Sequence, residues 1–233
     1  MLAAVFSDIH ANLEAFTAVF DAALSRGADR FWCLGDVVGY GGDPNACVDL
    51  ARRWCPVTVL GNHDAAVLDD AEIDLLPTSG QDAIADHRQR LGTAQVAWLS
   101  GLPVKATVEN ATLVHAAPSE PNLWPRLESM TATRDQFEYF DTAICFVGHS
   151  HRPSVASASL GVFRVRRGHR FLINVGSVGQ PRDGDPRASF GLFDTDAMTY
   201  ENVRVDYDVE RAANKIRDAG LPASLADRLQ RGV

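Results

Sequence analysis

Five short apolar runs in this chain each end in residues of the kinds that bind metal ions. The runs and the groups after them are residues 2–6 before Ser7-Asp8-Ile9-His10, 31–34 before Gly35-Asp36, 57–60 before Gly61-Asn62-His63-Asp64, 112–114 before His115, and 143–147 before Gly148-His149-Ser150-His151. An apolar run of this length, bounded by glycine and turn formers, predicts a buried strand. In open α/β sheets, ligands bind beyond the carboxyl ends of the strands. We therefore expect a metal site at one rim, large enough for two ions.

The composition limits the class of protein. With 233 residues and 46% hydrophobic content, the chain can bury the core of one α/β domain, and we expect a single domain over residues 1–233. The first apolar stretch is too short for a signal peptide, and no segment approaches the roughly 20 apolar residues of a membrane span. The four cysteines form no CxxC pair, which favours reduced, packed thiols in a cytoplasmic protein. A formal charge of −8 disfavours an extended nucleic-acid surface.

The order of predicted elements changes along the chain. The spacing of apolar residues predicts helices over residues 12–26, 43–53 and 209–219, and a mostly helical insertion over about 65–101 near the site. A hairpin is expected over 104–109 and 111–115. After residue 151 the pattern predicts short strands at 154–157, 162–165, 171–175, 189–193 and 200–205. Strand-dense sequence that closes an α/β domain suggests a second sheet packed against the first.

In order and spacing, the polar groups resemble the signature blocks of a known enzyme family. The blocks are Asp8-x-His10, Gly35-Asp36-x-x-Gly39, Gly61-Asn62-His63-Asp64, His115 and Gly148-His149-x-His151, and they resemble those of the calcineurin-like metallophosphoesterases. Residues 174–182 resemble a loop of the small bacterial and archaeal phosphodiesterase branch, which is related to diadenosine tetraphosphatases. Val175 stands where that loop usually has proline, and Ser150 replaces the usual threonine.

This resemblance implies a fold and a dinuclear metal centre. The expected fold is a four-layer α/β/β/α sandwich of two mixed sheets flanked by helices. One divalent ion would be held by Asp8, His10, Asp36 and His151, and the other by Asp36, Asn62, His115 and His149, with Asp36 as the bridge. Mixed carboxylate and imidazole ligands suit Mn²⁺, our first expectation, and also Fe²⁺, Ni²⁺, Zn²⁺ or Mg²⁺. A hydroxide shared by the two ions would attack the phosphorus.

The resemblance also implies roles for two neighbouring residues. His63 would face the substrate and protonate the leaving oxygen or stabilise its charge. Asp64 would orient the imidazole of His63 and hold it cationic.

Each block alone is weak, because a lone Gly-Asn-His-Asp is more often a turn than a site. Together they contain five of the seven histidines, all at predicted strand exits. Of the other two, His87 lies in a charged helical segment and is expected on a solvated face. His169 lies in the basic run 164–170, which we interpret as an exposed hairpin, with phosphate or nucleic-acid binding as the alternative. Trp124 could stack on a base or serve as a packing anchor.

Three arginines are candidates for substrate binding. Arg182 and Arg187 lie in a turn-rich loop that begins at a strand end, where a guanidinium could grip a second phosphate. An Asp–Arg salt-bridged turn is the equal alternative. Arg152, directly after the last predicted ligand, is a further candidate for contact with a substrate phosphate, as are Asn62 and His63.

These observations predict metal-dependent hydrolysis of a small phosphodiester or nucleotide. A Ser/Thr protein phosphatase or a dinucleoside polyphosphate hydrolase could use the same core. A catalytically silent, protein-binding scaffold is the alternative outside the enzymes, but such a scaffold would have lost ligands or the catalytic histidine, and neither loss occurs here.

Overall fold

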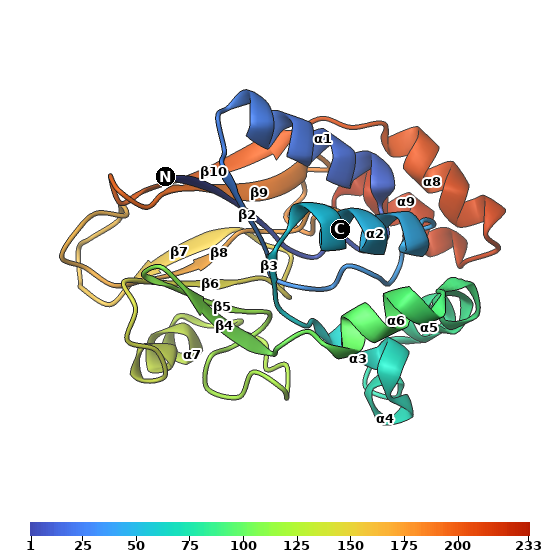
Figure 1. Cartoon of the computed structure of the whole chain (residues 1–233), viewed down its shortest axis with the longest axis horizontal. Coiled ribbons are helices and arrows are strands. Elements are labelled where there is room, and N and C mark those ends of the chain that lie inside the picture. The colour runs from blue at the N-terminus through green and yellow to red at the C-terminus, as the bar shows by residue number, and fades with distance from the viewer.

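The computed structural model describes residues 1–233 and contains two five-stranded mixed sheets that pack face to face, with helices outside (Figure 1). The first sheet has the order β10 (Thr199–Val205), β9 (Ala188–Asp194), β1 (Leu2–Phe6), β2 (Arg30–Cys33), β3 (Val57–Thr58). The second has the order β4 (Lys105–Val108), β5 (Ala111–Val114), β6 (Ile144–Val147), β8 (Phe171–Asn174), β7 (Ser154–Ser157). The expected four-layer architecture is confirmed.

The packing of β1 explains why the strands are continuous apolar runs. Successive side chains of a strand point to opposite faces, and both faces of this strand are covered. Ala3 and Val5 join the core between the two sheets, where Phe146 lies 5.4 Å from Phe193 between ring centroids. The alternate residue Phe6 joins the core on the helical side. A strand buried on both sides needs apolar residues at every position.

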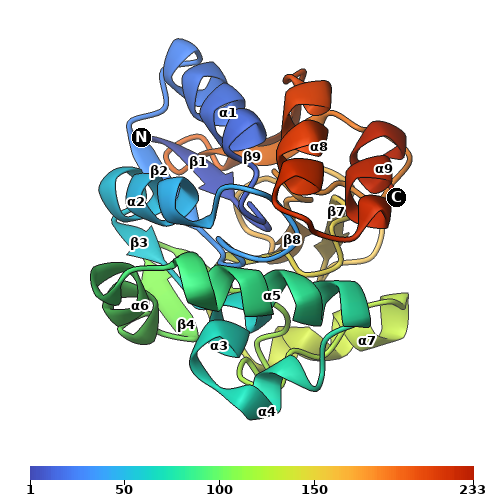
Figure 2. The ribbon, with the colours of Figure 1, turned by 90° about the vertical axis from the view of Figure 1, so that its right-hand side faces the viewer.

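Four helices pack on the first sheet or near the ends of its strands. They are α1 (Leu13–Ser25), α2 (Pro44–Trp54), α8 (Val209–Asp218) and α9 (Ala223–Arg231), with α8 packed on both α1 and α9 (Figure 2). Asn12 caps α1 by accepting a hydrogen bond from the backbone of Ala15, and Pro44 begins α2. The expected helices in these regions are therefore present.

The predicted helical segment between β3 and β4 contains four helices. These are α3 (Asn62–Leu68), α4 (Asp70–Ile73), α5 (Thr78–Arg90) and α6 (Thr93–Ser100), and they gather on one side of the molecule (Figure 2). Between β5 and β6 lie α7 (Met130–Asp135) and a single 3₁₀ turn, η1 (Gln136–Glu138). No helix has the length and apolar character needed to cross a membrane. All four cysteines are buried and free, as expected.

Two expectations about strands are wrong. Residues 162–165 form no strand, and Phe163 is 88% exposed. The adjacent strand β8 is paired with β6 on one side and β7 on the other, and the segment does not extend the sheet beyond β7. It lies between Gly161 (φ 74°) and Gly168 (φ 82°), whose left-handed conformations turn the chain. The last two strands do not join the second sheet either. β9 pairs antiparallel with β1, and β10 with β9, so they extend the first sheet.

The expectation that His87 lies on a solvated face is also wrong. Its side chain is fully buried on α5. Its Nδ1 accepts a hydrogen bond from the backbone N–H of Gly39 at 3.1 Å, and its Nε2 donates to the carbonyl of Gly41 at 3.0 Å. Gly80, Ala83 and Ile84 are also buried, and with His87 they follow the i, i+3, i+4, i+7 spacing of one helix face. The surrounding charges concealed this face in the sequence.

Candidate metal centre

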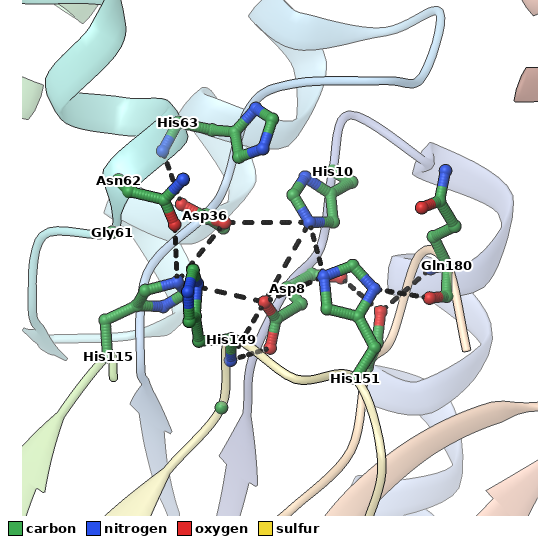
Figure 3. A network of polar contacts seen from close by, with 12 residues as sticks. Asp8, His10, Asp36, Gly61, Asn62, His63, His115, His149, His151 and Gln180 are labelled. Carbon is green, nitrogen blue, oxygen red and sulfur yellow. Dashed lines mark hydrogen bonds and ion pairs between the residues drawn. The ribbon is translucent and has the colours of Figure 1, made fainter. Parts of the chain in front are cut away.

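The five predicted strand exits meet at one rim of the two sheets. Five of the seven predicted ligands have left-handed backbone conformations: Asp8 (φ 52°), His10 (φ 49°), Asp36 (φ 52°), His149 (φ 63°) and His151 (φ 59°). Such conformations are uncommon for residues other than glycine and persist only when the surrounding structure enforces them. At each exit the chain turns sharply and aims its side chain back toward a shared point. Figure 3 shows this convergence, with Asp8 and Asp36 between the imidazole pairs.

The first cluster contains Asp8, His10 and His151. The Nδ1 atoms of the two histidines face the carbonyl oxygens of Val38 and Gln180, at 3.0 and 2.5 Å. Because a carbonyl only accepts, each Nδ1 carries the hydrogen and each neutral ring presents a bare lone pair at Nε2. The two Nε2 atoms lie 3.1 Å apart, and Asp8 Oδ1 lies 3.2 Å from that of His151.

The second cluster contains Asp36, Asn62, His115 and His149. Nδ1 of His115 donates to the carbonyl of Leu34 at 2.8 Å, so its Nε2 is also directed inward. That Nε2 lies 3.1 Å from Asn62 Oδ1 and 3.3 Å from Asp36 Oδ2. One ligand atom from each of Asp36, His115 and His149 fits within 4.8 Å.

Both clusters fit divalent cations. Lone pairs and carboxylate oxygens that face one another in a buried space repel unless a positive charge lies between them. Neutral imidazole, carboxylate and amide oxygen form a mixed donor set suited to Mn²⁺ and neighbouring transition metals. Asp36 is adjacent to both clusters, because its Oδ2 also lies 3.6 Å from His10 Nε2.

The pKa values of the four cluster histidines show that the buried carboxylates favour a positive charge nearby. Burial lowers the pKa of His10 and of His151, so both rings are neutral, and burial together with His115 lowers that of His149 to about 3. At His115 burial acts in the same direction, but the charges of Asp36 and Asp8 outweigh it and raise the pKa to about 9. Without metal, a proton on His115 is the charge that these carboxylates favour.

Residues 174–180 form hydrogen bonds with the segments that follow β1 and β6. Asn174 Nδ2 donates to the carbonyl of Gly148 at 2.6 Å, and Ser177 Oγ donates to that of Asp8 at 2.8 Å. The carbonyl of Gln180 accepts from Nδ1 of His151. This loop therefore positions side chains of the first cluster through the backbone around them.

Two glycines are required by close approach. A Cβ on Gly39 would lie 2.9 Å from His63 Cγ, and this residue also has φ +94°. A Cβ on Gly148 would lie 2.9 Å from Ser7 Cβ and would also collide with the Asp8 carboxylate. Both belong to the blocks identified in the sequence.

His63 lies beside the clusters. The expected contact between the Asp64 carboxylate and the His63 ring is absent. The backbone N–H of His63 donates to Asp36 Oδ1 at 2.8 Å, and its ring lines the pocket above the clusters. Its Nδ1 has no hydrogen-bond partner. The Asp64 carboxylate is buried and accepts from the backbone N–H groups of Val37, Val38 and Gly61 at 2.9–3.2 Å. Asp64 thus holds the loops after β2 and β3 together, and the expected Asp64–His63 hydrogen bond is absent.

A cavity of about 230 Å³ opens onto both clusters. Arg182 lines it, with its guanidinium 5.5 Å from the Tyr40 ring. Arg187 forms a salt bridge with Asp185 at 2.7 Å, the salt-bridged turn that was the alternative. Arg152 Nε donates to the carbonyl of Arg182, and neither Arg152 nor Arg187 lines the cavity.

Trp124 is buried and lines the same cavity. Its Nε1 donates to Glu72 Oε2 at 2.9 Å, which joins the loop before α7 to α4, so the residue serves as a packing anchor. Its place in the cavity wall is also compatible with stacking on a base. The basic run 164–170 lies outside the cavity. Arg170 there donates to the carbonyl of Phe137 at 2.8 Å, and its guanidinium lies 4.7 Å from the Phe140 ring centroid.

Sequence reasoning missed several residues of the cavity wall, among them Tyr40, Leu75 and Arg126. Tyr40 packs 4.6 Å from the ring of His10 and 4.4 Å from that of His63, between ring centroids. Its position between Gly39 and Gly41, close to a predicted ligand, was an available signal. Leu75 and Arg126 lie in segments without regular secondary structure, where no periodic pattern marks the side that faces the site.

Comparisons with known proteins agree with this geometry. Residues 1–198 match the family model of the calcineurin-like phosphoesterase superfamily domain. The chain belongs to this superfamily. It is 39% identical over 236 residues to an uncharacterized protein of Methanocaldococcus jannaschii, covering 97% of this chain and 96% of that one.

Solved structures of similar fold include a metallophosphoesterase. The crystal structure of a metallophosphoesterase from Sphaerobacter thermophilus is 35% identical, with a TM-score of 0.89, and the match covers 100% of this chain and 99% of the other. The hypothetical protein PH1004 from Pyrococcus horikoshii shares the fold, with a TM-score of 0.80, 19% identity and coverage of 100% and 98%. The chain is a metal-dependent phosphoesterase with candidate metal-binding clusters of aspartate and histidine.

Proposed function

We propose that this phosphoesterase hydrolyses a small phosphodiester or nucleotide with two divalent ions. Asp8, His10, Asp36 and His151 would hold one ion, and Asp36, Asn62, His115 and His149 the other. When bound, such a pair acidifies water and neutralises charge on the phosphoryl oxygens. The observation that carries the proposal is the convergence of bare acceptor atoms in both clusters, above all the two Nε2 atoms of His10 and His151 at 3.1 Å.

The chain's own residues would orient the phosphoester and supply a proton. Arg182 lies at the cavity wall, where its fixed positive charge attracts an anionic substrate. His63 would donate a hydrogen bond or a proton to the leaving oxygen. Burial lowers the pKa of His63 to about 4 in the free protein, which makes the ring neutral at pH 7. A phosphate anion within hydrogen-bond distance would raise that pKa, so protonation would be coupled to substrate binding.

The form of the cavity supports a small substrate. Its walls come from the α4–α5 connection, the loop before α7 and the loop that carries Arg182, so the clusters lie in a recess. A recess of about 230 Å³ suits a phosphate with small substituents.

A panel of phosphoesters tests this function. Metal-stripped protein would be supplied with Mn²⁺, Fe²⁺, Ni²⁺, Zn²⁺ or Mg²⁺ and assayed on an aryl monoester, a bis-aryl diester, a cyclic nucleotide, diadenosine tetraphosphate and a phosphopeptide. We expect metal-dependent turnover, fastest on a diester or nucleotide. Turnover of the phosphopeptide alone would indicate a protein phosphatase, and no turnover with any metal would favour the scaffold alternative.

A further inference from the structure

Two large apolar side chains on the cavity wall are left uncovered by the protein. Leu75 is 73% exposed and Leu123 is 63% exposed, and both line the cavity above the metal clusters. They come from separate segments, the connection between α4 and α5 and the loop before α7. Single exposed leucines are ordinary, but two from distant segments that face one recess form an apolar surface available to a ligand.

Two arginines, Arg126 and Arg182, line the same cavity. The backbone N–H of Arg182 donates to the carbonyl of His151 at 3.2 Å, which places Arg182 beside the first cluster. Arg126 belongs to the loop before α7, which also contains Leu123. The cavity therefore carries cations from two separate segments.

The two arginines differ in how far their hydrogen-bond donors are already used. Arg182 donates from Nε and Nη2 to Gln180 Oε1, at 3.2 and 2.8 Å, and lies over Tyr40. Arg126 has only Glu128, with Nη1 and Oε1 4.0 Å apart, and its side chain is half exposed. Its planar guanidinium is thus free to bind an anion through two N–H groups.

One carboxylate of this wall has a hydrogen-bond partner within the protein. Glu72 also lines the cavity, but its Oε2 accepts from the indole of Trp124. This bond joins the loop that contains Leu123, Trp124 and Arg126 to α4, which closely precedes Leu75, so both apolar segments are held together by a buried side chain.

We infer that the outer cavity recognises a substituent that combines an apolar ring system with a second anionic group, such as a nucleoside that carries a further phosphate. Leu75 and Leu123 contact the ring system, and Arg126 binds the second anion. The inference rests on the proposed function, because the scissile phosphodiester must lie at the metal centre for its substituent to reach this wall.

Three esters with the same leaving group separate these contributions. They are methyl 4-nitrophenyl phosphate, thymidine 3′-(4-nitrophenyl phosphate), and the latter with an added 5′-phosphate. Steady-state kinetics on the metal-loaded enzyme would compare Arg126→Ala and Leu123→Ser with the wild type. Arg134→Ala and Leu160→Ser are the matched controls, since both residues are exposed and outside the cavity.

For the wild type we expect the 5′-phosphate to lower KM by about fivefold, the effect of one half-exposed ion pair. Arg126→Ala should abolish that difference and leave the ester without the 5′-phosphate unchanged. Leu123→Ser should raise KM for both nucleoside esters by about fivefold, because apolar contact is lost, and should spare the methyl ester. The controls should match the wild type.

The outcomes distinguish this inference from the proposed function. Turnover of the methyl ester without any effect of the 5′-phosphate, or with an effect that survives in Arg126→Ala, would overturn the inference and leave the function standing. No turnover of any ester by the metal-loaded wild type would overturn both.

Discussion

Asp36 is the residue whose position bears most directly on the chemistry. One oxygen accepts the backbone N–H of His63, and the other lies 3.3 Å from His115 Nε2 and 3.6 Å from His10 Nε2. A single buried carboxylate thus contacts both clusters and positions the residue expected to act as the acid. Its charge, more than its shape, is what two cations require.

Asp36→Asn should lower metal content below two ions per chain and abolish hydrolysis of every ester. Asparagine keeps the size of the side chain but not its charge, and the other nearby carboxylate, Asp8, is already proposed as a ligand of the first ion. Metal analysis of the purified protein and an activity assay check this, with the exposed Asp82→Asn as control. Two ions per chain and near-normal turnover in the variant would show that Asp36 is not the bridge.

His63→Ala should keep the metal content and cut turnover by roughly 10²–10⁴-fold, the contribution of a positioned proton donor. The loss should be smaller for a nitrophenolate leaving group, which needs little protonation, than for an alkoxide. Rates for a series of leaving groups check this, with His169→Ala as control. An equal loss across the series would show that His63 positions or stabilises charge and is not the acid.

At the scale of elements, helix α5 acts on the site through the loop after β2. Both ring nitrogens of His87 bind this loop, at Gly39 and Gly41, on either side of Tyr40. The helix therefore determines where Tyr40 lies between His10 and His63. Because the ring accepts from one backbone group and donates to the other, only its neutral form satisfies both.

The pH dependence of stability should report this contact. Burial lowers the pKa of His87 to about 4 from its usual 6.5. Between these values the unfolded chain binds a proton that the folded chain does not, so the contribution is complete above pH 6.5 and is lost as the pH falls toward 4. The contribution of His87 to the free energy of unfolding is roughly 3 kcal/mol for a fully buried group.

Replacing His87 tests this contribution. His87→Gln cannot titrate, so its free energy of unfolding should fall less steeply between pH 6.5 and 4 than that of the wild type. Urea unfolding of both metal-free proteins across this range is the measurement. Parallel curves would mean that His87 does not contribute to the pH dependence.

At the scale of the whole molecule, the two clusters connect the two sheets. Asp8 and Asp36 follow β1 and β2 of the first sheet, whereas His115, His149 and His151 follow β5 and β6 of the second. Ions bound at this rim would cross-link the sheets at the edge where loops, and not core side chains, join them. Metal binding should then stabilise the folded state as a whole.

Chelation of the metal should lower the melting temperature. With metal at about 100 times its dissociation constant, the stabilisation of about 2.7 kcal/mol corresponds to roughly 5–10 °C in a chain of this size. Calorimetry with and without chelator checks this. Asp36→Asn should show little response to the chelator, and an unchanged melting temperature in the wild type would show that metal does not bind the folded protein selectively.

The sequence by itself determined the strand exits and the residues at them. The runs that end in Asp8, Asp36 or His115 can be identified locally. A strand that is buried on both faces is a continuous apolar run, whatever its place in the sheet. The exits meet at one rim because parallel strands of packed sheets point the same way. For that reason the sequence pattern is sufficient to predict that Asp8, Asp36 and His115 lie close together.

Tertiary structure alone decided which partner each remaining group finds. The charged helical segment around His87 predicted a solvated face, yet its ring binds a loop backbone, because elements distant in the chain pack against it. Residues 162–165 have strand-like composition but pair with no strand of either sheet. The hydrogen bonds of Asp64 and the exposure of Leu75 arise in the same way. Burial and pairing depend on groups that meet only in the folded molecule, and no local pattern records them.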